Sequence, residues 1–256
     1  MRNHTTWVVR PILFALLLVA PARADSPTTL PAAPPAGLDP ALWSRMTRVD
    51  ALADKITDLT ADFEQQKFTP LLKKPMVSTG AVRAKGAAML WDTRQPEPTM
   101  MRVDEKEVRI YYPSQKTVEI YPIAGQLSAL AASPLPRLAA LLPHFKFAAA
   151  SDQDIGKDMG ELDRANQLAL RLTPIDAALR EHVDSVTVLI DAQRGFILAF
   201  KLIDADGERT VIRFFNVKTN ANLDDSRLQL NLPADVKTVR PLENLGPSPR
   251  SGTAPK

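Results

Sequence analysis

The 256-residue chain has no cysteine and only three histidines. Without cysteine there can be no disulfide bond, cysteine-ligated zinc, iron–sulfur cluster, thiol nucleophile or lipid-modified cysteine. Beyond residue 24 the histidines are His144 and His182, and they are not spaced as metal ligands. The common nucleophile, zinc, phosphate-loop and dinucleotide motifs are missing as well. We therefore expect neither an enzyme nor a protein with a metal or another cofactor.

A charge excess of either sign is also missing once the first 24 residues are set aside. The whole chain has 32 lysines and arginines against 29 acidic residues. Residues 1–24 contain Arg2, Arg10 and Arg23 and no acid, so the rest of the chain is neutral. A neutral domain gives no support for a nucleic-acid partner or for an anionic membrane as partner. The apolar content of 45% excludes wholesale disorder.

Residues 1–24 have the three parts of a secretory signal. Two arginines precede an uncharged apolar run, residues 11–20, and Ala22-Arg23-Ala24 fits the small-x-small pattern of a cleavage site. The run is about half of the ~20 residues that a membrane span requires, which disfavours a membrane anchor. No cysteine follows it, so a bacterial lipoprotein is not expected. We predict cleavage between Ala24 and Asp25 and a soluble, periplasmic protein.

The mature chain divides into a proline-rich tether at 25–40, one domain at 41–240 and a loose tail at 241–256. A long amphipathic helix is predicted from about Ala41 to Phe68, where Pro70 ends it. Asp50 and other acids lie on its polar face. The apolar face is formed by residues three or four positions apart: Leu42, Met46, Val49, Ala53, Ile56, Leu59 and Phe63.

Alternating apolar residues then predict a series of short strands. The first five candidates are 77–85, 87–93, 99–104, 107–113 and 116–122. A Leu- and Ala-rich segment, 127–142, interrupts them, and its prolines limit it to short helical pieces. After a polar loop around 151–160, alternation resumes near 168–172, 186–190, 196–202, 212–214 and 228–232. The fold class is therefore α+β. We predict a strongly curved antiparallel sheet of about nine to eleven strands, covered by one long N-terminal helix and short helices.

Several motifs in this order resemble the periplasmic lipoprotein carrier family LolA. They are Phe63-Glu-Gln65, Gly80-Ala-Val82, Met89-Leu90-Trp91 with Pro96, Tyr111 with Pro113, Ser133-Pro134-Leu135, and Asn220 followed by Leu228-x-Leu230 and Pro233. The resemblance covers about residues 42–240. No single motif is specific for this family. The ordered set of motifs, the signal and the absence of a lipidation cysteine are specific in combination. The last point separates the chain from the related acceptor LolB, which is itself a lipoprotein.

The resemblance implies an incomplete β-barrel whose short helices form a lid over a hydrophobic cavity. It implies acylated lipoproteins as cargo, received from an inner-membrane LolCDE-type ABC transporter and passed to a LolB-like outer-membrane acceptor, by a carrier expected to be a monomer. The residues expected to line the acyl-chain cavity are Phe63, Met89, Trp91, Leu198, Phe200 and Phe214. The residues expected on the lid are Leu130, Leu135, Leu138, Leu141 and Leu142, which could equally be ordinary core residues on capping helices.

The sequence departs from the family at one position. An Arg-Pro pair normally follows the Gly-x-Leu strand, and its arginine ties the lid to the sheet. Here Lys85-Gly86 stands in that place, and an ammonium cannot replace a bidentate guanidinium one for one. Lys85 is therefore only a candidate latch. The alternative function is a lipid- or lipoprotein-sensing adaptor, as in RseB, which resembles this family but carries a second domain for which the chain leaves no room.

Overall fold

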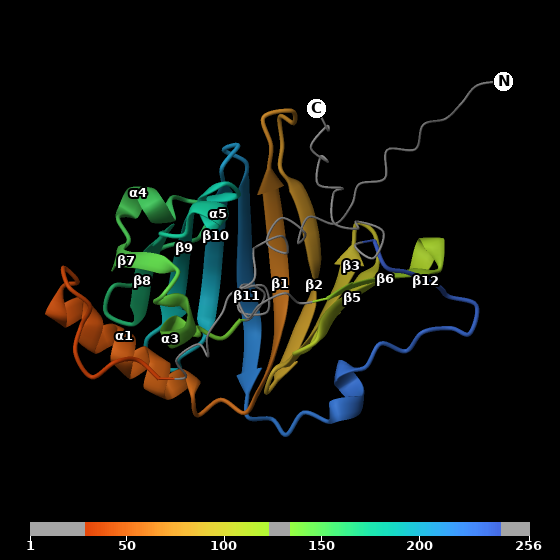
Figure 1. Cartoon of the computed structure of the whole chain (residues 1–256), viewed down its shortest axis with the longest axis horizontal. Coiled ribbons are helices and arrows are strands. Elements are labelled where there is room, and N and C mark those ends of the chain that lie inside the picture. Colours follow the sequence, from red (N-terminus) through yellow and green to blue (C-terminus); the bar gives the residue numbers. More distant parts are fainter. Residues whose placement is uncertain (1–28, 123–133, 242–256) are drawn as a thin grey trace, which may run out of the picture.

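A computed structural model describes residues 29–122 and 134–241 (Figure 1). The predicted signal, the cleavage site, Leu130 with the first part of the predicted lid, and the tail from 242 onward lie outside the described residues. The tether is described from residue 29. Leu30 and Leu38 in this segment pack against the hydrophobic core, so this part of the predicted tether is held on the domain.

The first helix, α1, runs from Pro40 to Ala53. The Asp39 side chain caps it by accepting a hydrogen bond from the Leu42 N–H (2.8 Å), and proline suits the first helical position. The prediction of one helix to Phe68 is wrong, because residues 58–68 form strand β1. Leu59 and Phe63 are four residues apart, a spacing that puts side chains on one face of a helix and also on one face of a strand.

Five strands follow β1 in the first half of the domain, and they agree closely with the predicted segments. They are β2 (Met76–Lys85), β3 (Ala88–Gln95), β4 (Thr99–Val103), β5 (Glu107–Tyr112) and β6 (Thr117–Pro122). A 3₁₀ turn, η2 (Pro113–Gln115), joins the last two. Each strand is hydrogen-bonded to the next in antiparallel register, which makes this half a meander.

The second half is another antiparallel meander with three short helices. Its elements are α3 (Leu138–Leu141), β7 (Phe145–Ala149), α4 (Asp152–Ile155), β8 (Gln167–Pro174), α5 (Ala177–Arg180), β9 (Val183–Asp191), β10 (Ile197–Asp204) and β11 (Arg209–Thr219). The sequence did not predict β7, α4 or α5. The strand predicted at 228–232 is also wrong, since η3 (Asp225–Leu228) ends at its first residue and the next strand is the short β12 (Lys237–Val239).

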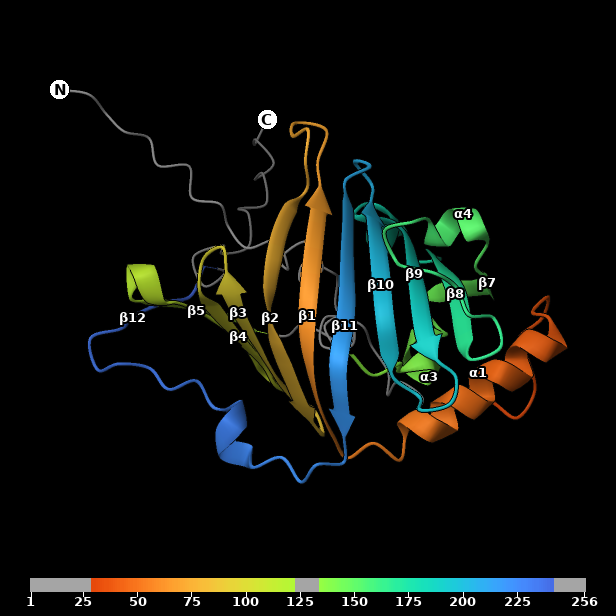
Figure 2. The ribbon, with the colours of Figure 1, turned by 180° about the vertical axis from the view of Figure 1, so that it is seen from behind.

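Within the described residues the strands form one sheet of twelve, slightly more than predicted, in the order β12-β6-β5-β4-β3-β2-β1-β11-β10-β9-β8-β7. The two meanders join at its centre, where β1 pairs with β11 and Phe63 stands opposite Phe214. Only the β12–β6 pairing is parallel among those described. The sheet is curved and its ends, β7 and β12, do not meet (Figures 1 and 2). The predicted α+β fold with an incomplete barrel is confirmed.

The main hydrophobic core lies on one face of this sheet, which we call the inner face. The helices α1 and α3 lie over the half of it that contains β8, β9 and β10 (Figure 1). Leu42, Trp43, Met46 and Val49 of α1 are buried there. The helix therefore covers the sheet as its apolar spacing predicts, although it is half the expected length.

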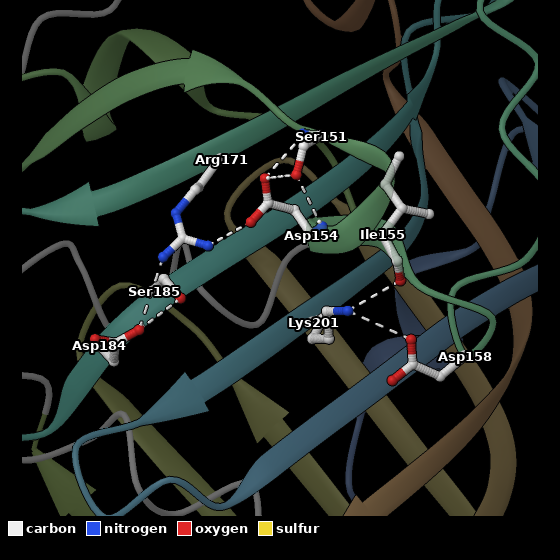
Figure 3. A network of polar contacts seen from close by, with 8 residues as sticks. All are labelled: Ser151, Asp154, Ile155, Asp158, Arg171, Asp184, Ser185 and Lys201. Carbon is white, nitrogen blue, oxygen red and sulfur yellow. Dashed lines mark hydrogen bonds and ion pairs between the residues drawn. The ribbon is translucent and has the colours of Figure 1, made fainter.

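The opposite, outer face is covered at both ends. The segment after β11 packs Leu223 and Leu228 on Leu90 of β3. At the other end, the segment around α4 packs Ile155 and Met159 over β9, β10 and β11. A network of charged side chains accompanies α4, with Arg171 bound to Asp154 and Asp184 (Figure 3).

Lys201 is buried at the centre of this α4 contact. Its ammonium donates to the Ile155 carbonyl (2.9 Å) and to Asp158 Oδ1 (3.3 Å) (Figure 3). Asp158 also pairs with Arg209. Removal of one partner of a buried charge pair leaves the other uncompensated. We expect Lys201→Ala to lower the free energy of unfolding by roughly 3 kcal/mol in urea titrations. The exposed Lys146→Ala is the control, and an equal effect of both changes would contradict this role for Lys201.

Candidate functional site

Four aromatic side chains meet on the inner face near the centre of the sheet. Phe63 of β1 contacts Trp91 of β3 edge to face, with ring centroids 4.8 Å apart. Trp91 lies 5.8 Å from Phe214 of β11, and Phe214 lies 6.4 Å from Phe200 of β10. The row therefore spans five neighbouring strands, and such ring contacts add to the energy of apolar burial.

Of the other two predicted cavity residues, one lies on the same face and one lies at a bulge between the two faces. Met89, two positions from Trp91 on β3, is buried in the same core. Leu198 of β10 lies where the β9–β10 register shifts, and it packs against both the inner core and the outer-face cluster that contains Ile155 and Met159. The structure thus brings five of the six predicted lining residues together on the inner face, and Leu198 is shared with the outer face. Alternation along each strand supplied this placement, because side chains two apart share a face.

Gly80 on β2 explains how Phe63 and Trp91 reach each other across an intervening strand. It stands directly opposite Phe63 in the β1–β2 register. A Cβ atom at this position would lie 2.8 Å from Cε1 of Phe63 and 2.1 Å from the Asp92 carbonyl oxygen. Only glycine, which has no Cβ atom, fits at this position. Its lack of a side chain allows the Phe63 and Trp91 rings to meet over the backbone of β2.

The short helix α3 belongs to the same inner-face cluster. Leu135 and Leu138 are buried in it, and Leu141 and Leu142 are partly buried against it. The Pro134 carbonyl accepts a hydrogen bond from the Ile197 N–H (2.9 Å) at the start of β10. The described part of the predicted lid thus packs on the inner face of the sheet.

Asp50 ties α3 to α1, a contact that sequence reasoning missed. Its side chain was assigned to the polar face of the helix, but the residue is only 7% exposed. Burial raises its pKa from 3.8 to about 6, and the Asp54 carboxylate acts in the same direction. Hydrogen bonds from the backbone N–H groups of Leu138 and Ala139 act in the opposite direction, as does the Arg137 guanidinium. Asp50 therefore meets the first N–H groups of α3, which the helix itself leaves unpaired.

The comparison with known families agrees with this arrangement. The sequence pattern of the family described as "Outer membrane lipoprotein carrier protein LolA" matches residues 54–231. The chain belongs to the LolA family. A protein named outer-membrane lipoprotein carrier protein from Vibrio parahaemolyticus serotype O3:K6 is 28% identical over 179 residues, which are 70% of this chain and 77% of that protein.

Two solved structures that are similar to this chain share less of its sequence. An uncharacterized conserved protein from Thermus thermophilus is 15% identical, with a TM-score of 0.49 over 78% of this chain and 99% of that one. A LolA superfamily protein from Nitrosomonas europaea is 11% identical, with a TM-score of 0.39 over 74% of this chain and 97% of that one.

The candidate latch Lys85 lies on the face of β2 opposite to α3. Val82 and Ala84 of β2 face the inner core, so Lys85 points to the outer face, away from α3. Its ammonium binds the Leu223 carbonyl (2.9 Å) and Asp225 (2.6 Å), in the segment that leads into η3. The hydrogen bond to Asp225 raises the pKa of Lys85. Lys85 therefore fastens the C-terminal segment of this LolA-family chain, and the contacts described for it do not include the described part of the predicted lid.

No helix in the two described ranges is long and apolar enough to cross a membrane. The same ranges contain no group of three or more histidine, aspartate or glutamate side chains placed to hold a metal ion. The described site of this LolA-family chain is thus an apolar one, built from ring contacts and leucines.

The raised pKa of Asp50 predicts a pH-dependent stability. The folded state binds more protons than the unfolded state between about pH 4 and pH 6, so this contribution is fully present below 3.8 and is lost as pH rises through about 6. The difference corresponds to roughly 3 kcal/mol. We expect Asp50→Asn to remove this dependence, so that the stability of the variant relative to wild type rises from about pH 4 to about pH 7. Urea titrations at both pH values measure it. A constant difference between the two proteins would contradict the assignment.

Proposed function

We propose that this LolA-family protein is exported through its N-terminal signal and carries acylated lipoproteins through the periplasm, from the inner to the outer membrane. The observation that supports this best is the row of aromatic side chains under a short, leucine-bearing helix, in a chain that matches the carrier family over most of its length. The acyl chains would lie on the inner face against Phe63, Trp91 and Phe214.

The energetics of acyl chains favour such an arrangement. Each buried CH₂ group is worth about 0.8 kcal/mol, so a chain of about 14 carbons represents on the order of 10 kcal/mol. A carrier can take up this chain only by enclosing it, and it can release it only if the empty state buries its own apolar surface. Leu138 of α3 and Leu135 just before this helix are suited to that role, because both are buried in the inner-face cluster. Loading then exchanges leucine contacts for acyl contacts.

The proposal also assigns partners by analogy with the family. A LolCDE-type transporter in the inner membrane would supply the cargo, and a LolB-like acceptor would receive it. The inner face contributes no catalytic step: it binds and shields hydrocarbon, and the direction of transfer comes from the partners. A monomer suffices for this role, since the cluster is built by one chain.

Fluorescence of Trp91 tests the proposal directly. Trp43 of α1 is replaced by phenylalanine, and an acylated lipoprotein is titrated into the protein. We expect a shift or quenching of the emission, because the indole is buried beside Phe63 and Phe214 where the acyl chain would enter. The same lipoprotein without its acyl chains is the control and should leave the spectrum unchanged. An unchanged spectrum with saturating acylated cargo would count against the inner face as the site.

A native mass spectrum of the protein from its own host separates the carrier from the sensing adaptor. A lipoprotein that co-purifies with the chain supports the carrier, and free lipid alone supports the adaptor.

A further inference from the structure

The hairpin between β1 and β2 projects from one end of the sheet and carries leucines at its tip. Figures 1 and 2 show that it reaches beyond the neighbouring β10–β11 hairpin at the same end. Leu71 is 90% exposed and Leu72 is 49% exposed. Exposure of two adjacent leucines to water is unfavourable, and it does not contribute to the stability of the fold. We refer to residues 70–75 as the hairpin tip.

The base of this hairpin is held firmly, so that the tip is presented in one place. The Lys67 ammonium pairs with Glu208 at 2.5 Å, and the Arg209 guanidinium lies 4.0 Å from the centre of the Phe68 ring. A turn closes above it, with the Leu72 N–H donating to the Thr69 carbonyl (3.1 Å). The tip begins with Pro70 and ends with Pro75, neither of which has an N–H group to extend the sheet.

The charges around the leucines have one sign. Lys73 and Lys74 are exposed on the tip, and no acidic residue occurs between Glu64 and Asp92. Lys67 is neutralised by Glu208, so the free positive charge of this hairpin lies beside the leucines. The acidic Asp204 and Asp206 belong to the β10–β11 hairpin, which ends short of the tip (Figure 1). The neutral charge of the whole domain conceals this local arrangement.

We propose that the hairpin tip docks the protein onto an anionic membrane surface. Leu71 and Leu72 enter the boundary between headgroups and acyl chains, while the ammonium groups of Lys73 and Lys74 bind lipid phosphates. A protruding tip with two leucines is too small for a specific protein interface, which buries about 1,200 Å² or more. Shallow insertion into a fluid lipid layer requires no matching pocket, and it combines apolar burial with attraction to anionic lipids. This surface is separate from the inner face and goes beyond the carrier function.

Vesicle co-sedimentation tests the tip without cargo. The purified chain, with its N-terminus determined by mass spectrometry, is mixed with vesicles of equal parts phosphatidylethanolamine and phosphatidylglycerol, or of phosphatidylcholine alone. We expect binding to the anionic vesicles that weakens as salt is raised. Leu71→Ser with Leu72→Ser should lower the partition coefficient tenfold or more, because two leucines would no longer insert their apolar side chains into the lipid. Lys73→Gln with Lys74→Gln should lower it by about tenfold on anionic vesicles only.

Matched controls separate the tip from general apolarity and charge. Ile175→Ser removes a side chain that is as exposed as Leu72, at 49%, but lies far along the chain after β8. Lys146→Gln with Lys157→Gln removes two exposed lysines elsewhere. Both controls should bind vesicles as the wild type does. All variants share one N-terminus, so any binding by an uncleaved leader is common to them and cancels in the comparison.

Absence of wild-type binding to anionic vesicles, or binding that the leucine variant retains, would overturn the proposal. So would a loss of binding in the controls equal to that in the tip variants. The Trp91 titration is repeated on the leucine variant to separate the two sites. A normal acyl response with lost vesicle binding supports a separate docking tip. Tip-dependent vesicle binding without any Trp91 response would refute the carrier proposal and leave the docking surface standing.

Discussion

Replacing Leu138 with glutamate is expected to abolish the loading of acylated lipoprotein. Leu138 is 2% exposed and lies with Leu135 in the inner-face cluster, over the sheet that we propose to hold the acyl chain. A carboxylate in this place would face hydrocarbon without a partner, a burial that costs far more than the leucine contact it replaces. The measurement is the transfer of a lipoprotein from spheroplasts to the soluble fraction.

Two further variants make this result interpretable. Leu138→Gln keeps the shape of the glutamate without its charge and should retain part of the loading. Leu141→Glu places the same charge at a partly buried position on the same helix and should have a smaller effect than Leu138→Glu. Far-ultraviolet circular dichroism shows whether each variant keeps the sheet. Normal loading by a folded Leu138→Glu protein would mean that α3 does not cover the acyl site.

The second large effect is expected at Gly80, on stability rather than on transport. A methyl group there would meet the Asp92 carbonyl oxygen at 2.1 Å and the Phe63 ring at 2.8 Å. The first contact is with backbone of the paired strand, which cannot move aside without breaking the β2–β3 register. We expect Gly80→Ala to lower the free energy of unfolding by about 3 kcal/mol or more, as overpacking does in a tight core.

Urea denaturation followed by circular dichroism measures this loss. Ser78→Ala, two residues earlier on the same strand, already has a Cβ atom and should change the stability by less than about 1 kcal/mol. A Gly80→Ala protein as stable as that control would show that β2 and β3 can separate locally. The aromatic contact between Phe63 and Trp91 would then not depend on the glycine.

The strands were predictable from the sequence where alternation and breaks agree. Segments β2 to β6 follow period two and are separated by proline or charged turns, so their bounds are nearly those expected. The region from Leu59 to Phe63 was not, because its apolar spacing satisfies a helix and a strand equally. The pairing of β1 with β11 decides between them, and that pairing is a tertiary contact which the local sequence does not record.

The candidate site was partly predictable for the same reason. The predicted lining residues Phe63, Met89, Trp91, Phe200 and Phe214 do share the inner face, whereas Leu198 lies at a bulge in β10 and also contacts the outer face. The contacts of Asp50 and Lys85 could not be predicted, because each residue binds a partner that is far away in the sequence. Asp50 meets the N–H groups of α3, and Lys85 meets the segment after β11.

The central pairing of β1 with β11 also governs when this protein can fold. These are the first and the last long strands of the domain, yet they lie side by side in the middle of the sheet. A chain that emerges from its N-terminus can form β1 to β6 early, but β1 keeps an open edge until nearly the whole domain is available. Contacts between strands so distant in sequence slow folding, and an open edge invites wrong partners. For the export that we propose, which would carry the chain across a membrane unfolded, the same delay is useful, since the two halves of the sheet pair only after the last strands have arrived.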